Sequence, residues 1–483
     1  MKKTALFALA GVICLSITAC GEKESVSVSK SETTSESSSS IESSVKSVVE
    51  TKSNGNENTG SKKSTTGNSA TEFLKDATIE ETVLYDEDNV KITATDLTYS
   101  NSSAEISVSI ENGSDKDLSF ICGSLGYSCN SVNGYMIQDG YMNSDVAAGK
   151  SAYETIQISY DELLMYGINE LADIEIGIQI SDDDYNNIYT GGKQILTSAA
   201  DTYEYKEDSY RTAITSDAVM NAYNYTIPYF TDEKLLDQDG LEILSAAFVE
   251  QNDGETKLFL EVKNTSEQDL CAVTRNISIN GLTVCSSNWS SNIINAGKIC
   301  VITLQLGNMM EKSCYEAYGI DEYGEISLEL AIKDTDGNEI GNPATVNIIN
   351  PKAKTEFDSE GVEVYNSNDI RIIMKGIVES DLNYRDETYV LFVVENNRDD
   401  AVVVKYSSGS FSLNNVMVDA YEYSYNYERS ASSDLKIELM NSDLEELGIS
   451  SPDEINDIEF TLEIRDTQYN TIDEPVISVD MNE

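Results

Sequence analysis

Three matching phrases decide the fold of this chain: Ser109-Ile-Glu-Asn-Gly-Ser-Asp-Lys-Asp-Leu118, Glu261-Val-Lys-Asn-Thr-Ser-Glu-Gln-Asp-Leu270 and Val393-Val-Glu-Asn-Asn-Arg-Asp-Asp-Ala-Val402. Each contains an asparagine that is followed 70 positions later by an aspartate at the end of an alternating stretch. These pairs are Asn112 and Asp182, Asn264 and Asp334, and Asn396 and Asp466. A long fixed period is typical of tandem copies of one folded unit. The sequence therefore predicts three repeats.

Each copy opens with a short predicted hairpin whose turn is built from Asp, Asn, Ser or Gly. The hairpins span Leu84 to Ile92, Leu235 to Ile243 and Val364 to Ile372. Asp, Asn and Gly tolerate the positive φ that tight turns need. Stretches such as Ala104 to Ile110 and Lys257 to Lys263 then alternate apolar and polar residues. This pattern predicts antiparallel strands with one buried face.

One short helix is expected in each copy. Capping-box spacing places its start at Ser159 with Glu162, Asn308 with Glu311, and Ser442 with Glu445. Left-handed glycines followed by Ile are expected to end it, at Gly167, Gly319 and Gly448. Many strands with frequent turn signals favour a sandwich of two sheets.

We therefore expect an all-β protein of three tandem β-sandwich domains, each with one short helix. The predicted domains are residues 75–200, 225–350 and 352–482, with an acidic, tyrosine-rich connector at 201–224. Because each copy has a full set of strands, residues 352–482 are expected to fold alone.

Several phrases of the first copy resemble the immunoglobulin-like repeat of surface lipoproteins from anaerobic, clostridial-type Gram-positive bacteria. They are Asn133-Gly-Tyr-Met136, Asp145-Val-Ala-Ala-Gly-Lys150 and Tyr166-Gly-Ile-Asn-Glu-Leu-Ala-Asp-Ile-Glu175. The second copy keeps Asn280-Gly281 and Ala296-Gly-Lys298, whereas the third has Asn414-Asn415 and lacks the Ala-Gly-Lys phrase. The resemblance implies an extracellular immunoglobulin-like β-sandwich. It brings no catalytic residues with it.

The first twenty residues form a predicted lipoprotein signal peptide. Lys2 and Lys3 precede an apolar run, and the run ends in Ala19 and Cys20. Cleavage after Ala19 would leave Cys20 as the attachment point for fatty acyl chains such as palmitate, and a plain signal peptide with a coincidental cysteine is the alternative. No other stretch has the roughly 18 apolar residues that span a bilayer. We expect a cell-membrane protein, lipid-anchored and facing the extracellular side.

Residues 21–74 are predicted to be a disordered linker. Residues 22–70 hold 22 Ser or Thr and almost no large apolar side chains. Such a composition cannot bury enough surface to offset the entropy of ordering the chain. As a flexible coil the linker would extend about 40 Å.

The net charge of −53 narrows the classes of function. A strongly negative field repels phosphate backbones, so no nucleic-acid partner is expected. The chain has no histidine, which excludes Ser-His-Asp and Cys-His catalysis. The acidic stretches at Asp182–Asp184 and Asp334–Glu339 could offer oxygens to calcium, but hairpin turns are the simpler explanation, and neither metal nor cofactor is expected.

Six cysteines follow Cys20, at positions 122, 129, 271, 285, 300 and 314. Export and an even count permit disulfides. The positions are not shared between copies, however, and this favours isolated buried thiols.

Tyrosines provide the one hint of a binding surface. Tyr421, Tyr423, Tyr425 and Tyr427 alternate with polar residues, so in one strand all four rings would face the same way. Trp289 in the second copy and Tyr141 in the first are further candidates. If exposed, these rings could stack on sugars or on a protein partner; if buried, they are part of a core.

Together these features predict a membrane-anchored extracellular lipoprotein that is not an enzyme and serves in binding, adhesion or envelope structure. The alternative is a carbohydrate-binding surface protein that uses its tyrosine-rich strand faces. The expected partners are the membrane, through the lipid anchor, and a cell-wall glycan or a protein.

Overall fold

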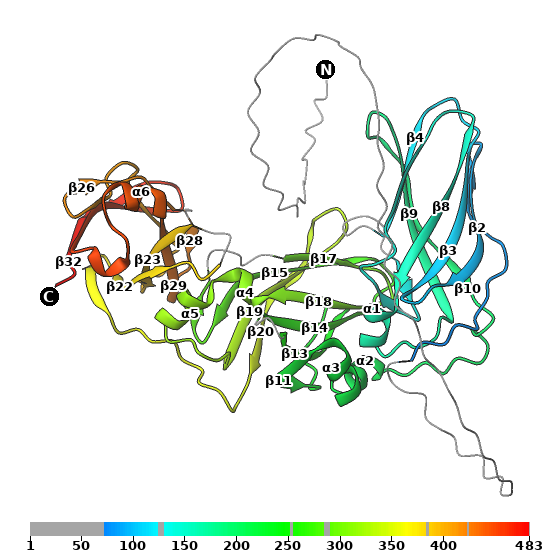
Figure 1. Ribbon diagram of the computed structural model, residues 1–483, viewed down its shortest axis with the longest axis horizontal. Coiled ribbons are helices and arrows are strands. Elements are labelled where there is room, and N and C mark those ends of the chain that lie inside the picture. The colour runs from blue at the N-terminus through cyan, green and yellow to red at the C-terminus, as the bar shows by residue number, and fades with distance from the viewer. Residues whose placement is uncertain are drawn as a thin grey trace, which may run out of the picture. The chain divides into compact units, whose positions relative to one another are not determined.

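The computed structural model describes residues 72–482, apart from 124–129, 252–254, 285–289, 383–385 and 423–424. Ala19, Cys20 and almost all of the predicted linker lie outside the described residues. The described part belongs to one compact unit that begins at Ser69. It is an all-β protein of several sheets with a few short helices (Figure 1). Below, the three copies predicted from the sequence are called repeats 1, 2 and 3.

Repeat 1 contains two antiparallel sheets. The first has the order β1-β2-β3-β8. The second centres on β9, with β10 on one side, β4 on the other, and β7 beyond β4. The helix α1 (Tyr160–Met165) connects the two sheets. The strands are β1 (Thr82–Glu87), β2 (Val90–Tyr99), β3 (Ser103–Asn112), β4 (Leu118–Cys122), β7 (Met142–Val146), β8 (Lys150–Ser159), β9 (Asp173–Asp182) and β10 (Asn187–Leu196).

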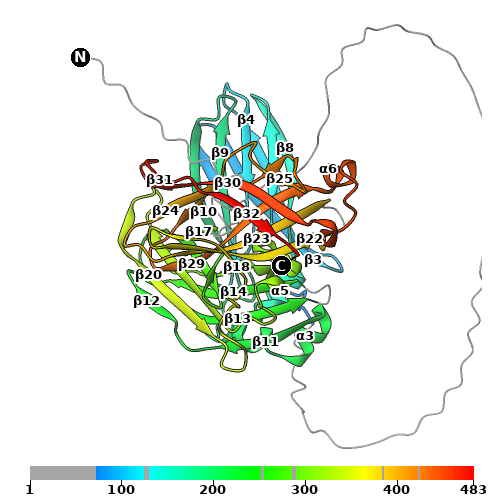
Figure 2. The ribbon, with the colours of Figure 1, turned by 90° about the vertical axis from the view of Figure 1, so that its left-hand side faces the viewer.

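Repeat 2 follows the same order. Its first sheet runs from β11 (Tyr225–Thr231) through β13 and β14 to β18, an order visible in both views (Figures 1 and 2). Its second sheet is β20, β19, β15 and β17. The other elements are β12 (Leu236–Gln238), β13 (Leu241–Gln251), β14 (Thr256–Asn264), β15 (Leu270–Ile279), β17 (Ser290–Ile294), β18 (Ile299–Gln305), α4 (Leu306–Met309), α5 (Lys312–Ala317), β19 (Glu325–Lys333) and β20 (Glu339–Ile349).

Repeat 3 repeats the arrangement once more, with β21-β22-β23-β29 as its first sheet. The second sheet centres on β30, flanked by β24, β31 and β32, with β28 beyond β24. The elements are β21 (Val362–Ser367), β22 (Ile370–Glu379), β23 (Glu387–Asn396), β24 (Val402–Tyr406), β27 (Ala420–Tyr421), β28 (Tyr425–Tyr427), β29 (Ala431–Met440), α6 (Asn441–Glu446), the 3-10 turn η1 (Pro452–Glu454), β30 (Asp457–Asp466), β31 (Thr471–Asp473) and β32 (Val476–Asp480).

The periodic asparagines and aspartates organise turns. The Asn112 amide donates to the carbonyl oxygens of Lys116 and Val146, both at 2.8 Å, and Asn264 and Asn396 make corresponding bonds. Asp182 accepts from the backbone and side chain of Asn186, as Asp334 and Asp466 do in their own turns. The pKa of each aspartate lies below its ordinary value, for Asp182 chiefly because Lys116 donates to it and then because of Asn186, and for Asp334 and Asp466 chiefly because of Asn338 and Asn470. Asp182 and Asp334, which open the two acidic stretches considered as calcium ligands, therefore act as acceptors in hairpin turns.

The predicted helix ends are correct and two of the predicted starts are wrong. Gly167, Gly319 and Gly448 have φ of 73°, 68° and 76° and end their helices. Ser159 caps α1 by accepting from the amide of Asp161 at 3.1 Å. In repeats 2 and 3 the N-caps are Glu311 and Met440, without side-chain capping bonds.

The expectation of a single helix per repeat is also wrong for repeat 2, which has α4 and α5. The connector contributes two more helices, α2 (Ser209–Ile214) and α3 (Asp217–Tyr223), before β11 adds an edge to repeat 2. Within the described residues, no helix has the length and apolar character needed to cross a membrane.

The hydrophobic cores cross the repeat boundaries. The core of repeat 1 includes Val249 and Val301 of repeat 2, and the core of repeat 2 includes Tyr389, Leu391 and Val393 of repeat 3. Each of these five side chains is buried. The repeats are therefore packed on one another. An isolated fragment of residues 352–482 would lose the packing of Tyr389, Leu391 and Val393 against repeat 2.

Candidate functional site at the first repeat junction

A short parallel strand pair joins repeat 1 to repeat 2. After β5 (Ser131–Val132), a turn at Asn133 and Gly134 leads into β6 (Tyr135–Met136). Tyr135 pairs in parallel with Ile299 of β18, whose amide donates to the carbonyl oxygen of Gly134 at 2.9 Å. One 11-stranded sheet therefore runs from repeat 1 into repeat 2. We call this the first junction.

A buried polar cluster reinforces the first junction. Glu261 in β14 is fully buried and accepts from the Tyr135 hydroxyl at 3.2 Å and from Ser245 Oγ at 2.9 Å. Arg211 of α2 places its Nε 3.3 Å from the same carboxylate. Burial raises the pKa of Glu261, and the Ser245 hydrogen bond and the Arg211 charge oppose that shift. The cluster thereby ties repeat 1, the connector and repeat 2 to one carboxylate.

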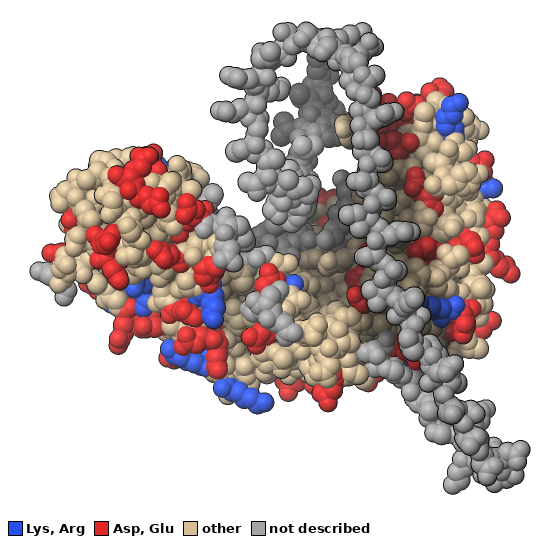
Figure 3. Space-filling model, viewed as in Figure 1, with Lys and Arg blue, Asp and Glu red and all other residues tan. Residues whose placement is uncertain are grey.

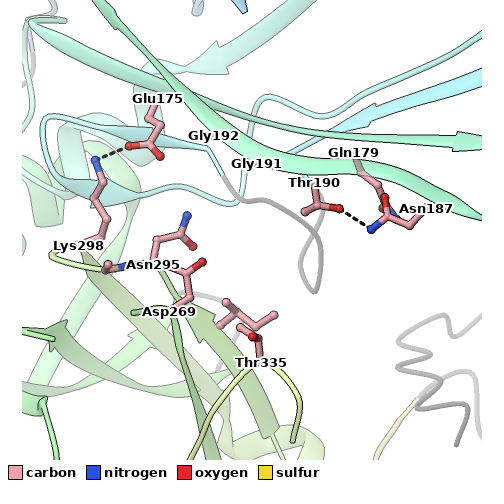
Figure 4. A pocket seen from close by; sticks show the side chains of 12 residues that line it. Glu175, Gln179, Asn187, Thr190, Gly191, Gly192, Asp269, Asn295, Lys298 and Thr335 are labelled. Carbon is pink, nitrogen blue, oxygen red and sulfur yellow. Dashed lines mark hydrogen bonds and ion pairs between the residues drawn. The ribbon is translucent and has the colours of Figure 1, made fainter. Parts of the chain in front are cut away.

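A polar cleft of about 650 Å³ opens beside the first junction (Figure 4). Lys298, just before β18, lies with its Nζ 2.8 Å from Glu175 Oε2 of β9, so the two repeats are also joined by an ion pair. A Cβ on Gly192 would lie 2.3 Å from Glu175 Oε1, so glycine leaves room for this pair. The cleft is lined by Glu175, Gln179, Asn187, Thr190, Gly191, Gly192, Asp269, Ile293, Asn295, Ala296, Lys298 and Thr335.

The chemistry of this cleft is that of polar binding. Its lining offers amide, hydroxyl and charged groups, and none of the lining residues is aromatic. Among the described residues, the groups that could hold a ligand here are hydrogen-bonding and ionic ones.

The predicted tyrosine row is not a single surface. Tyr421 lies in β27, which pairs with β29, and is 53% exposed. Tyr427 lies in β28, which pairs with β24, and is fully buried in the core of repeat 3. The prediction that the rings face one way is wrong for these two, because the segment divides between two strands of different sheets. Tyr423 lies outside the described residues, and Tyr425 is placed only as part of β28.

The remaining candidates do not gather at one place. Tyr141 is 59% exposed, just before β7. Trp289 lies outside the described residues, as do Cys129 and Cys285. Cys122 and Cys314 are buried free thiols, as expected from the sequence, whereas Cys271 and Cys300 are only half-buried. Burial raises the pKa of Cys122 and of Cys314 to about 12. Both are therefore protonated and unreactive at neutral pH.

Sequence reasoning missed the residues that form the junction. The sequence did mark Lys298 as a noteworthy position, because the Ala-Gly-Lys phrase occurs in both repeat 1 and repeat 2. Glu261 had none, since a charged residue in an alternating strand is normally interpreted as exposed. Only the pairing of β6 with β18 brings Tyr135 to it.

The buried carboxyl group of Glu422 in repeat 3 is expected to make the stability of the protein depend on pH. It lines a hollow with Tyr406 and Tyr421, and its Oε2 accepts from the Tyr406 amide at 2.8 Å. Burial raises its pKa from 4.5 to about 7, against the effects of that hydrogen bond and of Lys405. Because the folded pKa is the higher one, this contribution to stability is complete below pH 4.5 and is lost as the pH rises towards 7.

Glu422→Gln keeps the acceptor and cannot ionise. We expect it to match the parent protein at pH 4 and to be more stable at pH 8 by roughly 2 to 3 kcal/mol at most. Urea unfolding at both pH values measures this, with the exposed Glu428→Gln as control. An equal difference at the two pH values would contradict the buried ionisation.

Comparisons with known proteins add no family. No family model and no curated protein sequence matches this chain. Among solved structures, a protein of unknown function from Porphyromonas gingivalis W83 is 12% identical over 47% of this chain and 91% of its own, with a TM-score of 0.14. An exo-chitosanase of Amycolatopsis orientalis is 7% identical over 83% and 79%, with a TM-score of 0.16. The BSP domain of a biofilm-associated protein is 11% identical over 87% and 68%, with a TM-score of 0.13. Likenesses of this size carry no argument about function.

Proposed function

We propose that this chain is a lipid-anchored extracellular protein of three immunoglobulin-like domains that serves in binding, adhesion or envelope structure and is not an enzyme. The immunoglobulin-like assignment is supported by the two antiparallel sheets of each repeat. The chain passes between these two sheets in the same order in all three repeats. The leader and Cys20 support the anchor.

The observation that carries this proposal is how the repeats are joined. A buried carboxylate with a perturbed pKa is a candidate catalytic group, although structural networks also contain such carboxylates. Here Glu261 is committed to holding repeats together, and Glu162 accepts from the amides of Gln138 and Asp139 within repeat 1. Serial joining through buried contacts suits a surface protein that presents its terminal repeat to a partner.

The surface charge suits the same role. Asp and Glu side chains are scattered over the face in Figure 3 without forming one patch. Such a surface favours solubility and repels anionic polymers. A glycan-binding alternative would have to use the cleft at the first junction, because the tyrosine row is divided. It is the weaker proposal, since the described residues that line this cleft are not aromatic.

The anchor is tested by Cys20→Ala. Because Cys20 is the predicted attachment point, the variant should lose its acyl chains and either persist as uncleaved precursor or be released into the medium. Detergent phase partitioning and mass spectrometry of the N-terminus measure this. A Cys20→Ala protein that still carries diacylglycerol-derived chains would rule the anchor out.

A further inference from the structure

The end of repeat 3 has the same construction as the two ends that are joined to a following repeat. Asn133, Asn280 and Asn414 have φ of 48°, 51° and 51°. Each side-chain oxygen accepts from two successive amides at the start of β9, β19 or β30. Each amide group donates to a carbonyl just before that strand. The three turns therefore present the strands that follow them in the same way.

A short strand follows each of the three asparagine turns, and two of these short strands pair with a strand of the next repeat. β6 pairs in parallel with β18, and β16 (Leu282–Thr283) pairs in parallel with β29. The register is the same in both, since the residue after the turn lies opposite Ile299 in one case and Ser432 in the other. We call the pairing of β16 with β29 the second junction.

The third strand has no such partner among the described residues. β26 (Val416–Met417) pairs only with β25 (Ser412–Leu413). Val416 is 46% exposed and Met417 is 57% exposed, whereas their counterparts Tyr135 and Met136 are buried in the first junction. An apolar strand edge in this state is ready to pair with another strand.

The charges at two equivalent positions of the repeats indicate which strand would pair with β26. Glu175, Ser327 and Glu459 occupy one position, seven residues before the periodic aspartate. Lys298 and Ala431 occupy another, beside the periodic asparagine of their repeat. The first junction has both charges, as the Glu175–Lys298 pair, and the second junction has neither, since Ser327 and Ala431 hold the two equivalent positions.

The free end carries the acidic member of this pair. Glu459 is exposed and has no ion pair with any described residue. The position equivalent to Lys298 in repeat 1 is Lys150, which lies opposite Asn112 and is also exposed. Repeat 1 and repeat 3 therefore each carry, on the side that faces no other repeat, one member of an ion pair like Glu175–Lys298: Lys150 in repeat 1 and Glu459 in repeat 3.

The receiving edge lies at the other end of the chain. β8 ends its sheet and pairs only with β3 among the described strands. Tyr153 in β8 is 85% exposed and holds the position of Val301, which lines a hollow in the first junction beside Tyr166. Leu447 holds the position of Tyr166 in repeat 3 and lines an open hollow of about 370 Å³ with Met417.

We propose that a second copy of this chain occupies the free end of repeat 3. β26 of one copy pairs in parallel with the start of β8 of the next, with Val416 opposite Ser151, Glu459 facing Lys150, and Tyr153 over Leu447. The contact joins two different surfaces, so it builds chains of molecules and not closed pairs. It stands apart from the membrane anchor, and either can fail without the other.

This contact should be weaker than the internal junctions. Ser107 of repeat 1 stands where repeat 2 has Phe259, so less apolar surface is buried. Two molecules of net charge −53 also repel each other. Association is therefore expected at high local concentration.

Sedimentation velocity of residues 69–483, over roughly 1 to 500 µM, tests the proposal. The mean mass of the parent protein should rise with concentration. Lys150→Glu and Glu459→Lys should each weaken association at least tenfold, because like charges then face each other. Lys193→Glu, an equal charge change on exposed β10, should have no such effect.

Mixing the two variants gives the decisive result. Glu459 of the Lys150→Glu protein can meet Lys150 of the Glu459→Lys protein, so the mixture should associate although neither variant does so alone. The double variant should also recover. A parent protein that stays monomeric throughout, or variants that associate as the parent does, would overturn the proposal. So would a mixture that stays monomeric.

Discussion

Replacing Leu391 and Val393 together by serine is expected to have opposite effects in the whole chain and in isolated repeat 3. Both side chains are buried in the core of repeat 2. In the whole chain the double change removes that packing and places two hydroxyls in an apolar interface, which should cost more than about 4 kcal/mol of unfolding free energy. Chemical denaturation of the region that contains repeats 2 and 3 measures the loss.

In the fragment 352–482 the same change should be beneficial. Without repeat 2, Leu391 and Val393 become exposed and should cause self-association. Repeat 1, which follows no other repeat, has Ser107 and Ser109 at these two positions. The double serine fragment should therefore be monomeric in light scattering, and the unmodified fragment should not.

A matched control separates the junction from the core. Val390 and Val394 lie on the same strand but are buried in the core of repeat 3 itself. Serine at both should destabilise the whole chain and the fragment alike. If the unmodified fragment proves monomeric and fully stable, the second junction contributes little to the fold.

Glu261→Ala should produce the second large loss. It leaves Arg211 without its carboxylate and Tyr135 and Ser245 without an acceptor, at a cost of about 3 kcal/mol, less than for a fully buried pair because Arg211 is partly exposed. Glu261→Gln retains the acceptor oxygen and should lose less than half as much.

A double-mutant cycle with Arg211→Met tests the cause. If the pair is responsible, Glu261→Ala should cost much less when Arg211 is already absent. Additive losses in the two variants would show that the carboxylate acts on its own.

Local chemistry made much of the fold predictable. Asn112 donates to Lys116 and Asp182 accepts from Asn186, each four residues away in its own turn, so these turn bonds mark a repeat even though both side chains also make longer-range bonds. Gly167 ends its helix for a similarly local reason, its positive φ. The capping boxes failed in repeats 2 and 3 because the start of a helix also depends on where the preceding strand ends.

The sequence of β23 carries a signal of the second junction. Residues 389–394 of β23 are apolar at every position, without the alternation of β3. A continuous apolar run fits a strand that is covered on both faces. Alternation does not predict a common face for the tyrosine row, because Tyr421 and Tyr427 lie in strands of different sheets.

By itself, the sequence determined that this protein has three repeats of sheet-forming segments with defined turns, because period and turn chemistry act between residues that are close along the chain. Only the tertiary structure decided which faces are covered, that Glu261 is buried, that Glu175 meets Lys298, and that β26 pairs with no described strand other than β25. The pattern of a strand can indicate how many of its faces are covered, but it does not identify the covering segment, which at the first junction lies more than a hundred residues away along the chain.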